Sequence, residues 1–205
     1  MGNNNVVGIA LDELYRIFDI LNKKYFNGSL EIPIITIQKA KSSGNLGWFT
    51  LEKIWTDKNN EDEKYEINIS AEHLRDEINS IVGTLLHEMV HYRNKTNDIK
   101  DCNGQIHNKK FASLAESVDL VVEKTKKFGF GLTSCSDRLD KFIEDEVKPD
   151  ESCFQYFRSI ILKPKDETEK KTCTYICPEC EEKVRGNKGI QIHCVTCDCE
   201  FAEKE

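Results

Sequence analysis

The stretch "TLLHEMVHYRNK", residues 84–95, lies in the segment that decides the fold. Apolar residues three and four positions apart share one face of a helix. In this stretch and just before it they form one stripe: Ile78, Ile81, Val82, Leu85, Leu86, Met89 and Val90. We therefore predict a helix over about residues 78–95 that is embedded in the core.

The same helix carries two histidines on one face. His87 and His91 are four residues apart, so both can direct an imidazole nitrogen at a single cation. Glu88 lies one step around the helix, where its carboxylate can reach a water molecule bound to that cation. In an alternative interpretation the face is solvated and Glu88 pairs with Arg93 or Lys95. The apolar stripe argues against this alternative, because it places the motif beside buried surface.

A third metal ligand has to come from elsewhere, because a catalytic zinc needs three protein ligands and one open position. Only one histidine, His107, follows the motif before the C-terminal cysteine-rich segment. A polar loop at 96–106 lets the chain reverse, so that His107 can approach His87 and His91. Zinc lowers the pKa of bound water, and Glu88 would accept the proton as this water attacks a carbonyl.

The rest of the first 150 residues predicts helices mixed with short strands. Helical periods, β-branched runs and alternating segments are separated by Gly, Pro and Asn signals. We expect helices at 9–26, 71–77 (capped by Ser70), 108–126 and 137–147, a strand at 32–40, and a hairpin with strands 47–55 and 64–70.

Several of these segments, in this order, resemble the SprT-like family. They are "YFNGSLEIPIITIQKAKSSGNLGWFT" (25–50), "EINISAEHL" (66–74), "TLLHEMVHYRN" (84–94) and "IHNKKFASLAE" (106–116), within a similarity over about residues 9–145. The resemblance implies an α+β, zincin-like metalloprotease domain in which a small mixed sheet packs on the HExxH helix. It places the catalytic glutamate at Glu88 and the zinc ligands at His87, His91 and His107. Phe111 matches the family spacing after the third histidine and is expected in the core.

The resemblance also implies an activity. Spartan-type members of the family are metalloproteases that act on proteins crosslinked to DNA, so we expect a zinc-dependent endopeptidase with a protein substrate that is associated with DNA. The formal net charge is −7, and we find no basic stretch interleaved with aromatic residues. Strong DNA binding is therefore not expected, although a weak or local contact stays open.

The C-terminus predicts a separate zinc ribbon. Cys177 and Cys180 form one Cys-x2-Cys knuckle, and Cys194 and Cys197 form another. Four thiolates close the coordination shell of a structural zinc, which can supply the folding energy that so short a segment lacks. Cys173, Cys199 and His193 are close enough in the sequence to substitute for one ligand. We expect a protease domain at 1–145, a connecting segment at 146–172 and the ribbon at 173–205.

The chain is expected to be cytoplasmic. Its first residues lack the basic and apolar pattern of a secretory signal, and no stretch has the ~18 apolar residues that span a bilayer. Intracellular thiols stay reduced, so the nine cysteines fit metal ligands and free thiols better than disulfides. No membrane partner is expected, and the oligomeric state is left open.

Several roles around the site stay undecided at the level of sequence. The segment 45–50 is our candidate for an edge strand that binds substrate, with Trp48 either near the cleft or simply in the core. The donor that stabilises the transition state could be Tyr92, Arg93 or Tyr156.

Two acidic residues and one long segment are also ambiguous. Asp98 or Asp101 could orient a ligand imidazole, but both resemble carboxylates that solvate a loop. Residues 146–172 could lie over the cleft and gate it.

Two functions of other classes compete with a protease. One is a non-catalytic adaptor that recruits a partner through the ribbon, and the intact Glu88 argues against it because a structural site needs no general base. The other is a DNA-binding regulator centred on the ribbon. From Cys173 onward the chain has 4 Lys or Arg against 7 acidic residues, which disfavours phosphate binding.

Overall fold

The computed structural model describes residues 5–42, 44–159 and 172–204. The chain divides into two compact units, Met1–Ile160 and Ile161–Glu205. The first unit mixes helices with small sheets, as the sequence predicted, and the second has short strands and no helix among its described residues, 172–204. Residues 160–171 of the connecting segment predicted at 146–172 lie outside the described residues, and the predicted domain boundaries stay predictions. The core of the first unit includes Val147 and Phe154.

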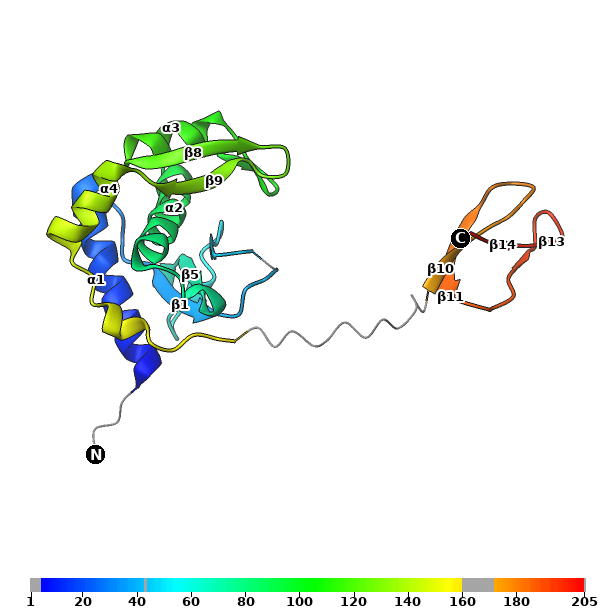
Figure 1. The fold of residues 1–205 in the computed structure, drawn as a ribbon, viewed down its shortest axis with the longest axis horizontal. Coiled ribbons are helices and arrows are strands. Elements are labelled where there is room, and N and C mark those ends of the chain that lie inside the picture. The colour runs from blue at the N-terminus through cyan, green and yellow to red at the C-terminus, as the bar shows by residue number, and fades with distance from the viewer. Residues whose placement is uncertain (1–4, 43, 160–171, 205) are drawn as a thin grey trace. The chain divides into compact units, whose positions relative to one another are not determined.

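Helix α2 (Ile78–Thr96) is the centre of the first unit and confirms the helix predicted at 78–95. In Figure 1 it lies between the strands β1 and β5 on one side and α3 with the β8–β9 hairpin on the other. Its apolar stripe is buried in the core between these two groups of elements. The buried residues of the stripe are Ile81, Val82, Leu85, Leu86, Met89 and Val90. The helix that carries the two histidines is therefore held from two sides.

A three-stranded sheet covers one side of α2. It consists of β1 (Ile34–Gln38), β5 (Glu66–Ser70) and β2 (Gly47–Phe49), in the order β1-β5-β2. Strand β5 is parallel to β1 and antiparallel to β2, and all of its residues are buried. Strand β2 is consequently at the edge of this sheet.

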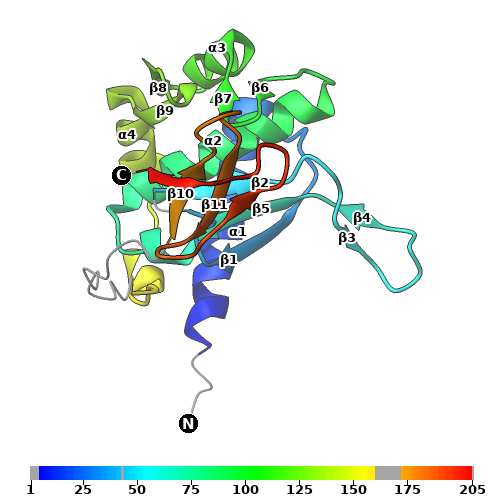
Figure 2. The same cartoon turned by 90° about the vertical axis from the view of Figure 1, so that its right-hand side faces the viewer.

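The predicted hairpin is confirmed in its pairing but not in its continuity. The segment 47–55 pairs with β5 only through β2, and the chain then leaves the sheet. Strands β3 (Trp55–Thr56) and β4 (Glu63–Lys64) form a separate two-stranded arm, which projects from the body of the unit in Figure 2.

Helix α1 (Val6–Phe26) packs along the core and confirms the helix predicted at 9–26. It begins where the Asn5 side chain accepts a hydrogen bond from the Gly8 N–H, and it ends at Asn27, which is left-handed. Leu14, Ile17, Phe18 and Leu21 are among its fully buried residues.

The helix predicted at 108–126 is wrong beyond Ser117. Helix α3 (Lys109–Ser117) begins as expected at Asn108, whose side chain accepts from two backbone N–H groups. The chain then turns at Asp119, which has a φ of 64°, and forms β8 (Leu120–Thr125) and β9 (Gly129–Cys135). β-branched residues favour a strand once a partner strand is present, and β9 supplies that partner.

The loop predicted after α2 contains two short strands, β6 (Cys102–Asn103) and β7 (Ile106–His107). They join the hairpin in a sheet of order β6-β7-β9-β8. Strand β7 meets β9 at a single pair, His107 with Gly129. This pairing positions His107 beside the hairpin.

The remaining elements of the first unit are short. Helix α4 (Asp137–Phe142) continues into a π-helical turn, η2 (Ile143–Val147), which confirms the helix predicted at 137–147. The helix predicted at 71–77 is reduced to a 3-10 turn, η1 (Ala71–His73), and η3 (Glu151–Phe154) is another. The Ser70 hydroxyl does not cap η1 but donates to the Asn45 carbonyl.

The second unit has almost no apolar core. Its strands are β10 (Thr172–Ile176), β11 (Lys183–Asn187), β12 (His193–Cys194), β13 (Cys199–Glu200) and β14 (Ala202–Lys204). They form one sheet of order β11-β10-β14 and a pair β12-β13. Among the described residues of this unit only Tyr175, Cys177 and Cys194 are buried.

Across the described parts of the chain, no helix combines the length and the apolar character that a membrane crossing requires.

Candidate active site

The three predicted histidines meet at one point in the first unit. Helix α2 supplies His87 and His91, and β7 supplies His107. Their candidate ligand nitrogens all lie within 4.8 Å of one another. The ring centroids are 5.0 Å (His87–His91), 5.2 Å (His87–His107) and 4.9 Å (His91–His107) apart. These residues could hold one metal ion.

Phe111 fixes the three imidazole rings by packing against all of them. Its ring centroid lies 4.6 Å from His87, 4.6 Å from His91 and 4.5 Å from His107. The side chain is fully buried, as expected from the sequence. Asn108, the residue directly after His107, caps the start of α3. The start of this helix therefore places Phe111 next to His107.

The hydrogen bonds of His91 and His107 fix which ring nitrogen carries the proton. His91 Nδ1 lies 2.7 Å from the Asp101 carboxylate, and His107 Nδ1 lies 3.3 Å from the Phe128 carbonyl. Both oxygens only accept, so each Nδ1 is the protonated nitrogen. The two Nε2 atoms, 3.0 Å apart, are the nitrogens left to face a cation, and each offers its lone pair when its imidazole is neutral. Two facing lone pairs fit a bound cation.

Burial keeps the site in the form that binds metal. Burial and the neighbouring histidines hold the pKa of His87 well below its usual value. Burial and His91 lower the pKa of His107 to about 4. Neutral imidazoles are the ligand form, so these two residues are ready to coordinate at neutral pH.

Glu88 lies beside the three histidines at the edge strand. Its side chain is 6% exposed. Burial raises the pKa of Glu88 to about 7, although the nearby His91 and the Phe49 backbone N–H favour the ionised form. A Cβ atom added to Gly47 would lie 3.4 Å from Glu88 Oε1, so the carboxylate sits directly against the backbone of β2.

A cleft of about 350 Å³ opens over this group. Its floor is α2, one wall is the segment that contains β2, and the other wall is the β8–β9 hairpin. The lining includes His87, Glu88 and His107, with Leu46, Gly47 and Trp48 on one wall and Phe128, Gly131, Leu132 and Thr133 on the other. Trp48 therefore lies at the cleft, as one of its two interpretations required.

The three candidates for a transition-state donor do not line this cleft. Tyr92 is buried in a stack with Phe49, and Arg93 donates a hydrogen bond to Ser29. Tyr156 is exposed elsewhere. None of the described residues from 146 to 159 lines the cleft either.

The sequence profile of the SprT-like family matches residues 14–133. The chain belongs to the SprT-like family. Searches of curated proteins and of solved structures gave no match. The matched range contains all three histidines and Glu88, and membership of the family suggests a metalloprotease-type function.

Sequence reasoning undervalued Asp101 in this SprT-like chain. We interpreted Asp98 and Asp101 alike as loop-solvating residues, but Asp101 is 5% exposed and bonds to both His91 and Asn94. Burial opposes ionisation of Asp101, yet hydrogen bonds from these two residues outweigh it and lower its pKa. Asp101 thus presents a carboxylate that orients the His91 ring.

Asp101→Asn is expected to lower the metal affinity of the site by about 10-fold to 100-fold, because an amide cannot orient His91 as a carboxylate does. Competition of the purified protein with a fluorescent zinc chelator measures this affinity. Asp98→Asn is the matched control, since Asp98 lies in the same loop and has a left-handed backbone that asparagine also tolerates. Equal affinities of the two variants would contradict the role of Asp101.

Two further site residues come from β9, which the sequence did not reveal as a strand. Thr133 Oγ1 lies 2.9 Å from His87 Nδ1. Gly131 packs so closely on His107 that an added Cβ would overlap the imidazole ring. The alternating glycines in "FGFGL" (128–132) were the only feature of the sequence that indicated a special role for this segment. Their contact with His107 can be recognised only when the pairing of the hairpin strands is known.

Gly131→Ala is therefore expected to displace His107 and to remove most of the bound metal from the first unit. Metal analysis after gel filtration measures the loss, and circular dichroism checks that the fold persists. Gly8→Ala is the control, because its Cβ meets only the end of the Asn5 side chain near the start of α1. If Gly131→Ala keeps its metal, the close approach of β9 does not matter.

The second unit brings the four predicted cysteines together. The sulfur atoms of Cys177, Cys180, Cys194 and Cys197 all lie within 4.8 Å of one another, so this group could also hold a metal. Cys199 stays an alternative ligand, since its sulfur is 3.5 Å from that of Cys177. His193 is engaged differently, 3.0 Å from Asp198 Oδ1.

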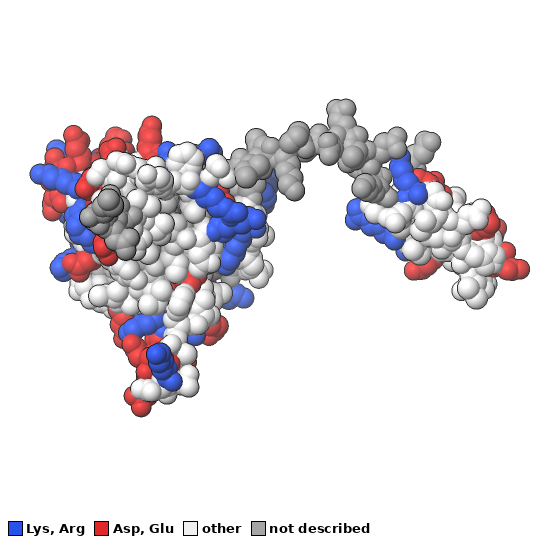
Figure 3. Space-filling view, turned by 90° about the horizontal axis from the view of Figure 1, so that it is seen from below, with Lys and Arg blue, Asp and Glu red and all other residues white. Residues whose placement is uncertain are grey.

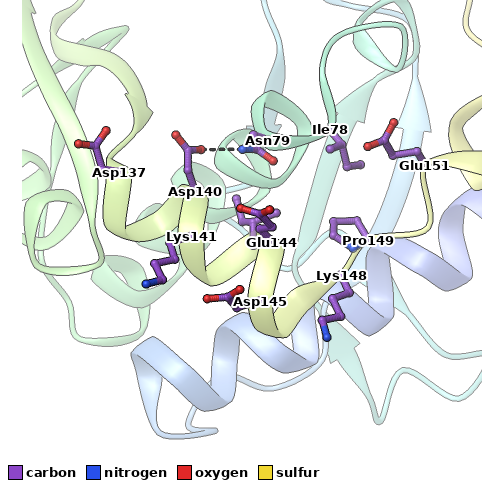
Figure 4. A pocket seen from close by; sticks show the side chains of 11 residues that line it. Ile78, Asn79, Asp137, Asp140, Lys141, Glu144, Asp145, Lys148, Pro149 and Glu151 are labelled. Carbon is purple, nitrogen blue, oxygen red and sulfur yellow. Dashed lines mark hydrogen bonds between the residues drawn. The ribbon is translucent and has the colours of Figure 1, made fainter.

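A larger cavity of about 760 Å³ lies beside α4 and contains none of the predicted site residues. Figure 4 shows its carboxylates projecting from α4 and the turn that follows, with Asn79 bonded to Asp140. That bond is 2.7 Å long. The larger cavity is therefore not the one that contains the candidate metal ligands. The smaller cleft is the candidate active site because His87, Glu88 and His107 line it.

Proposed function

We propose that this chain is a zinc-dependent endopeptidase with a zincin-like protease fold. His87, His91 and His107 would hold the zinc, and Glu88 would act as general base. The observation that carries the proposal is the convergence of the three histidines, whose candidate ligand nitrogens lie within 4.8 Å of one another beside the buried Glu88. When bound, zinc would supply a Lewis acid that polarises a carbonyl and lowers the pKa of coordinated water.

Glu88 would move the proton in this reaction. Burial raises the pKa of Glu88 to about 7, and a zinc ion held by the histidines would favour the ionised carboxylate, the form that accepts a proton. We propose that Glu88 accepts a proton from the attacking water and passes it to the leaving amine. Its buried position against β2 keeps bulk water from competing for that proton.

The free edge of β2 would hold the substrate backbone. The Leu46 carbonyl and the Thr50 N–H bond to β5, and Trp48 pairs with it in the same register. Backbone direction alternates along a strand, so the N–H and C=O groups of Gly47 and Phe49 point away from β5. The Gly47 carbonyl accepts from the Asn45 side chain and the Phe49 N–H faces Glu88, so the Gly47 N–H and the Phe49 carbonyl are the groups that would pair with an extended peptide bound as an added strand.

The second unit would bind a structural zinc through Cys177, Cys180, Cys194 and Cys197. Thiolates favour zinc over the hard cations, and four of them leave no open position for substrate. Because this unit buries so few apolar side chains, metal binding would provide most of its folding free energy.

The proposed substrate is a protein, and the family resemblance favours one that is associated with DNA or crosslinked to it. A weak DNA contact could use Lys183 and Arg185, which are exposed on β11. Fluorescence anisotropy with a labelled oligonucleotide, at low and high salt, would measure this contact, which should weaken as salt rises.

Cleavage of an unfolded reporter protein tests the proposed activity directly. We expect the zinc-loaded chain to cleave it, a chelator to abolish cleavage, and added zinc to restore it. Magnesium should not restore it, because that ion prefers oxygen ligands in octahedral geometry. A zinc-loaded chain that cleaves no unfolded protein, with or without DNA, would contradict the proposal.

A further inference from the structure

Two lysines adjoin the candidate active-site cleft, one at each wall. Lys127 lines the cleft at the turn between β8 and β9, and its Nζ lies 4.7 Å from the ring centroid of Phe128. Lys41 precedes β2, and its Nζ lies 4.2 Å from the ring centroid of Trp48 on the opposite wall. Each ammonium group is thus placed by an aromatic side chain that itself lines the cleft.

The exposed charge at this cleft is positive, although the chain as a whole has a net charge of −7. Within the described part of the chain, Glu88 is the only carboxylate that lines the cleft, and it is buried. Neither Lys41 nor Lys127 lies within 4.0 Å of a carboxylate oxygen of a described residue. Figure 3 shows that Lys and Arg side chains and Asp and Glu side chains form separate groups on one face of the first unit.

The sequence "KTKKFGF" at 124–130 contributes to this charge, and we overlooked it when we found no basic stretch with aromatic residues. Lys127 and Phe128 of this segment line the cleft, whereas Lys124 lies on β8, with its Nζ 5.4 Å from the Phe130 ring centroid. Folding brings Lys127 to the cleft whose opposite wall carries Trp48 and the adjoining Lys41, more than 80 residues earlier in the chain.

Exposed apolar side chains line the same cleft. Leu46, Phe128 and Leu132 line the cleft and are 38%, 38% and 48% exposed. Exposed apolar side chains that converge on one cleft are typical of a surface that binds another molecule. The cleft therefore offers an apolar surface with an unpaired cation on either side.

We propose that this cleft selects protein segments in which an acidic residue flanks an apolar residue close to the cleaved bond. The inference rests on the proposed protease function. The apolar side chain contacts Leu46 and Leu132, and the substrate carboxylate pairs with Lys127 or Lys41. A lysine or arginine at the same substrate position is repelled by both groups.

A peptide fits these observations better than a nucleic acid. Lys127 lines the cleft that contains His87 and Glu88, and Lys41 adjoins it over the ring of Trp48, so a nucleic-acid strand bound there would occupy the place of the substrate. The rings of Trp48 and Phe128 each already carry a lysine ammonium over one face, whereas Leu46 and Leu132 match an aliphatic side chain.

Three peptides that differ only in one residue beside a central leucine test the proposal: glutamate, glutamine or lysine. Their dissociation constants are measured by fluorescence anisotropy with the zinc-loaded Glu88→Gln protein, and their kcat/KM values with the wild type. We expect the glutamate peptide to bind about fivefold more tightly than the glutamine peptide, and the lysine peptide to bind most weakly. The difference should shrink at high salt.

Charge reversal identifies the residues responsible. Lys127→Glu and Lys41→Glu are each expected to reduce or invert the preference for the glutamate peptide. Lys58→Glu is the matched control, because Lys58 is exposed in the loop between β3 and β4 and changes the net charge equally. The control should keep the wild-type preference.

The outcomes separate this proposal from the protease function. Preferential binding of the glutamate peptide without any cleavage would support the selectivity and contradict the proposed activity. Equal binding of the three peptides at low salt would overturn the selectivity. So would a result in which Lys127→Glu weakens only the binding of a single-stranded oligonucleotide, since the lysines would then serve a nucleic acid.

Discussion

Glu88→Gln is expected to lower kcat/KM for peptide cleavage by about 100-fold to 10,000-fold, the usual contribution of a general base. Glutamine has nearly the same volume as glutamate, so it can fill the buried site against β2, but it cannot take a proton from water. The zinc content should stay at the wild-type value, because the three histidines are unchanged. Steady-state kinetics with a fluorogenic peptide and metal analysis measure both quantities.

Glu13→Gln is the matched control for that variant. Glu13 is also a buried glutamate, but it lies on α1 and bonds to Arg16 and the Asp150 N–H, away from the cleft. Its replacement should leave the peptide kinetics near those of the wild type. A Glu88→Gln protein that keeps full zinc and a tenth or more of the activity would remove Glu88 from the reaction.

The wild-type chain is expected to bind two zinc ions, and two single substitutions should each remove a different one. His107→Ala leaves two ligands at the histidine site, too few for a catalytic zinc, so it should lose both that zinc and peptide cleavage. Cys177→Ser should lose the other zinc and unfold the second unit, because metal binding is its main source of stability. Metal analysis by plasma mass spectrometry counts the ions per chain.

The two variants should also differ in activity. The first unit has its own apolar core, so Cys177→Ser is expected to keep the cleavage of small peptides. Cys135→Ser and His73→Ala serve as controls, since neither residue belongs to a candidate metal group in the described chain. A single zinc in the wild type, or one substitution that releases both ions, would contradict the account of two independent sites.

The helix at 78–96 shows what could be predicted from sequence. Its apolar stripe and the spacing of His87 and His91 lie within a few residues of each other, and helical geometry converts that spacing directly into a shared face. The Cys-x2-Cys knuckles are predictable for the same reason. In both cases the pattern is local, so no knowledge of distant contacts is needed.

The error after α3 shows where this reasoning fails. Val118 and Val122 continue the helical period of α3, yet the chain forms β8 from residue 120 onward. The competing interaction is the pairing of β8 with β9, which a periodicity argument cannot include. Because the hairpin was missed, Thr133 and Gly131 were missed with it.

The sequence by itself determined the kinds of groups at the site and the pairs that are close in the chain: His87 with His91, with Glu88 between them, and the cysteine knuckles. It also singled out His107, but only as the remaining histidine. Helical and knuckle spacing fix such geometry within a few residues.

The tertiary structure decided everything that joins distant segments. The pairing of β7 with β9 brings His107 to α2, and the approach of the loop after α2 turns Asp101 into the partner of His91. The meeting of two walls over α2 places Lys41 and Lys127 at one cleft, so a chain that is acidic overall has a positive site. These arrangements depend on sheet pairing and packing between residues far apart in the chain, which no local pattern encodes.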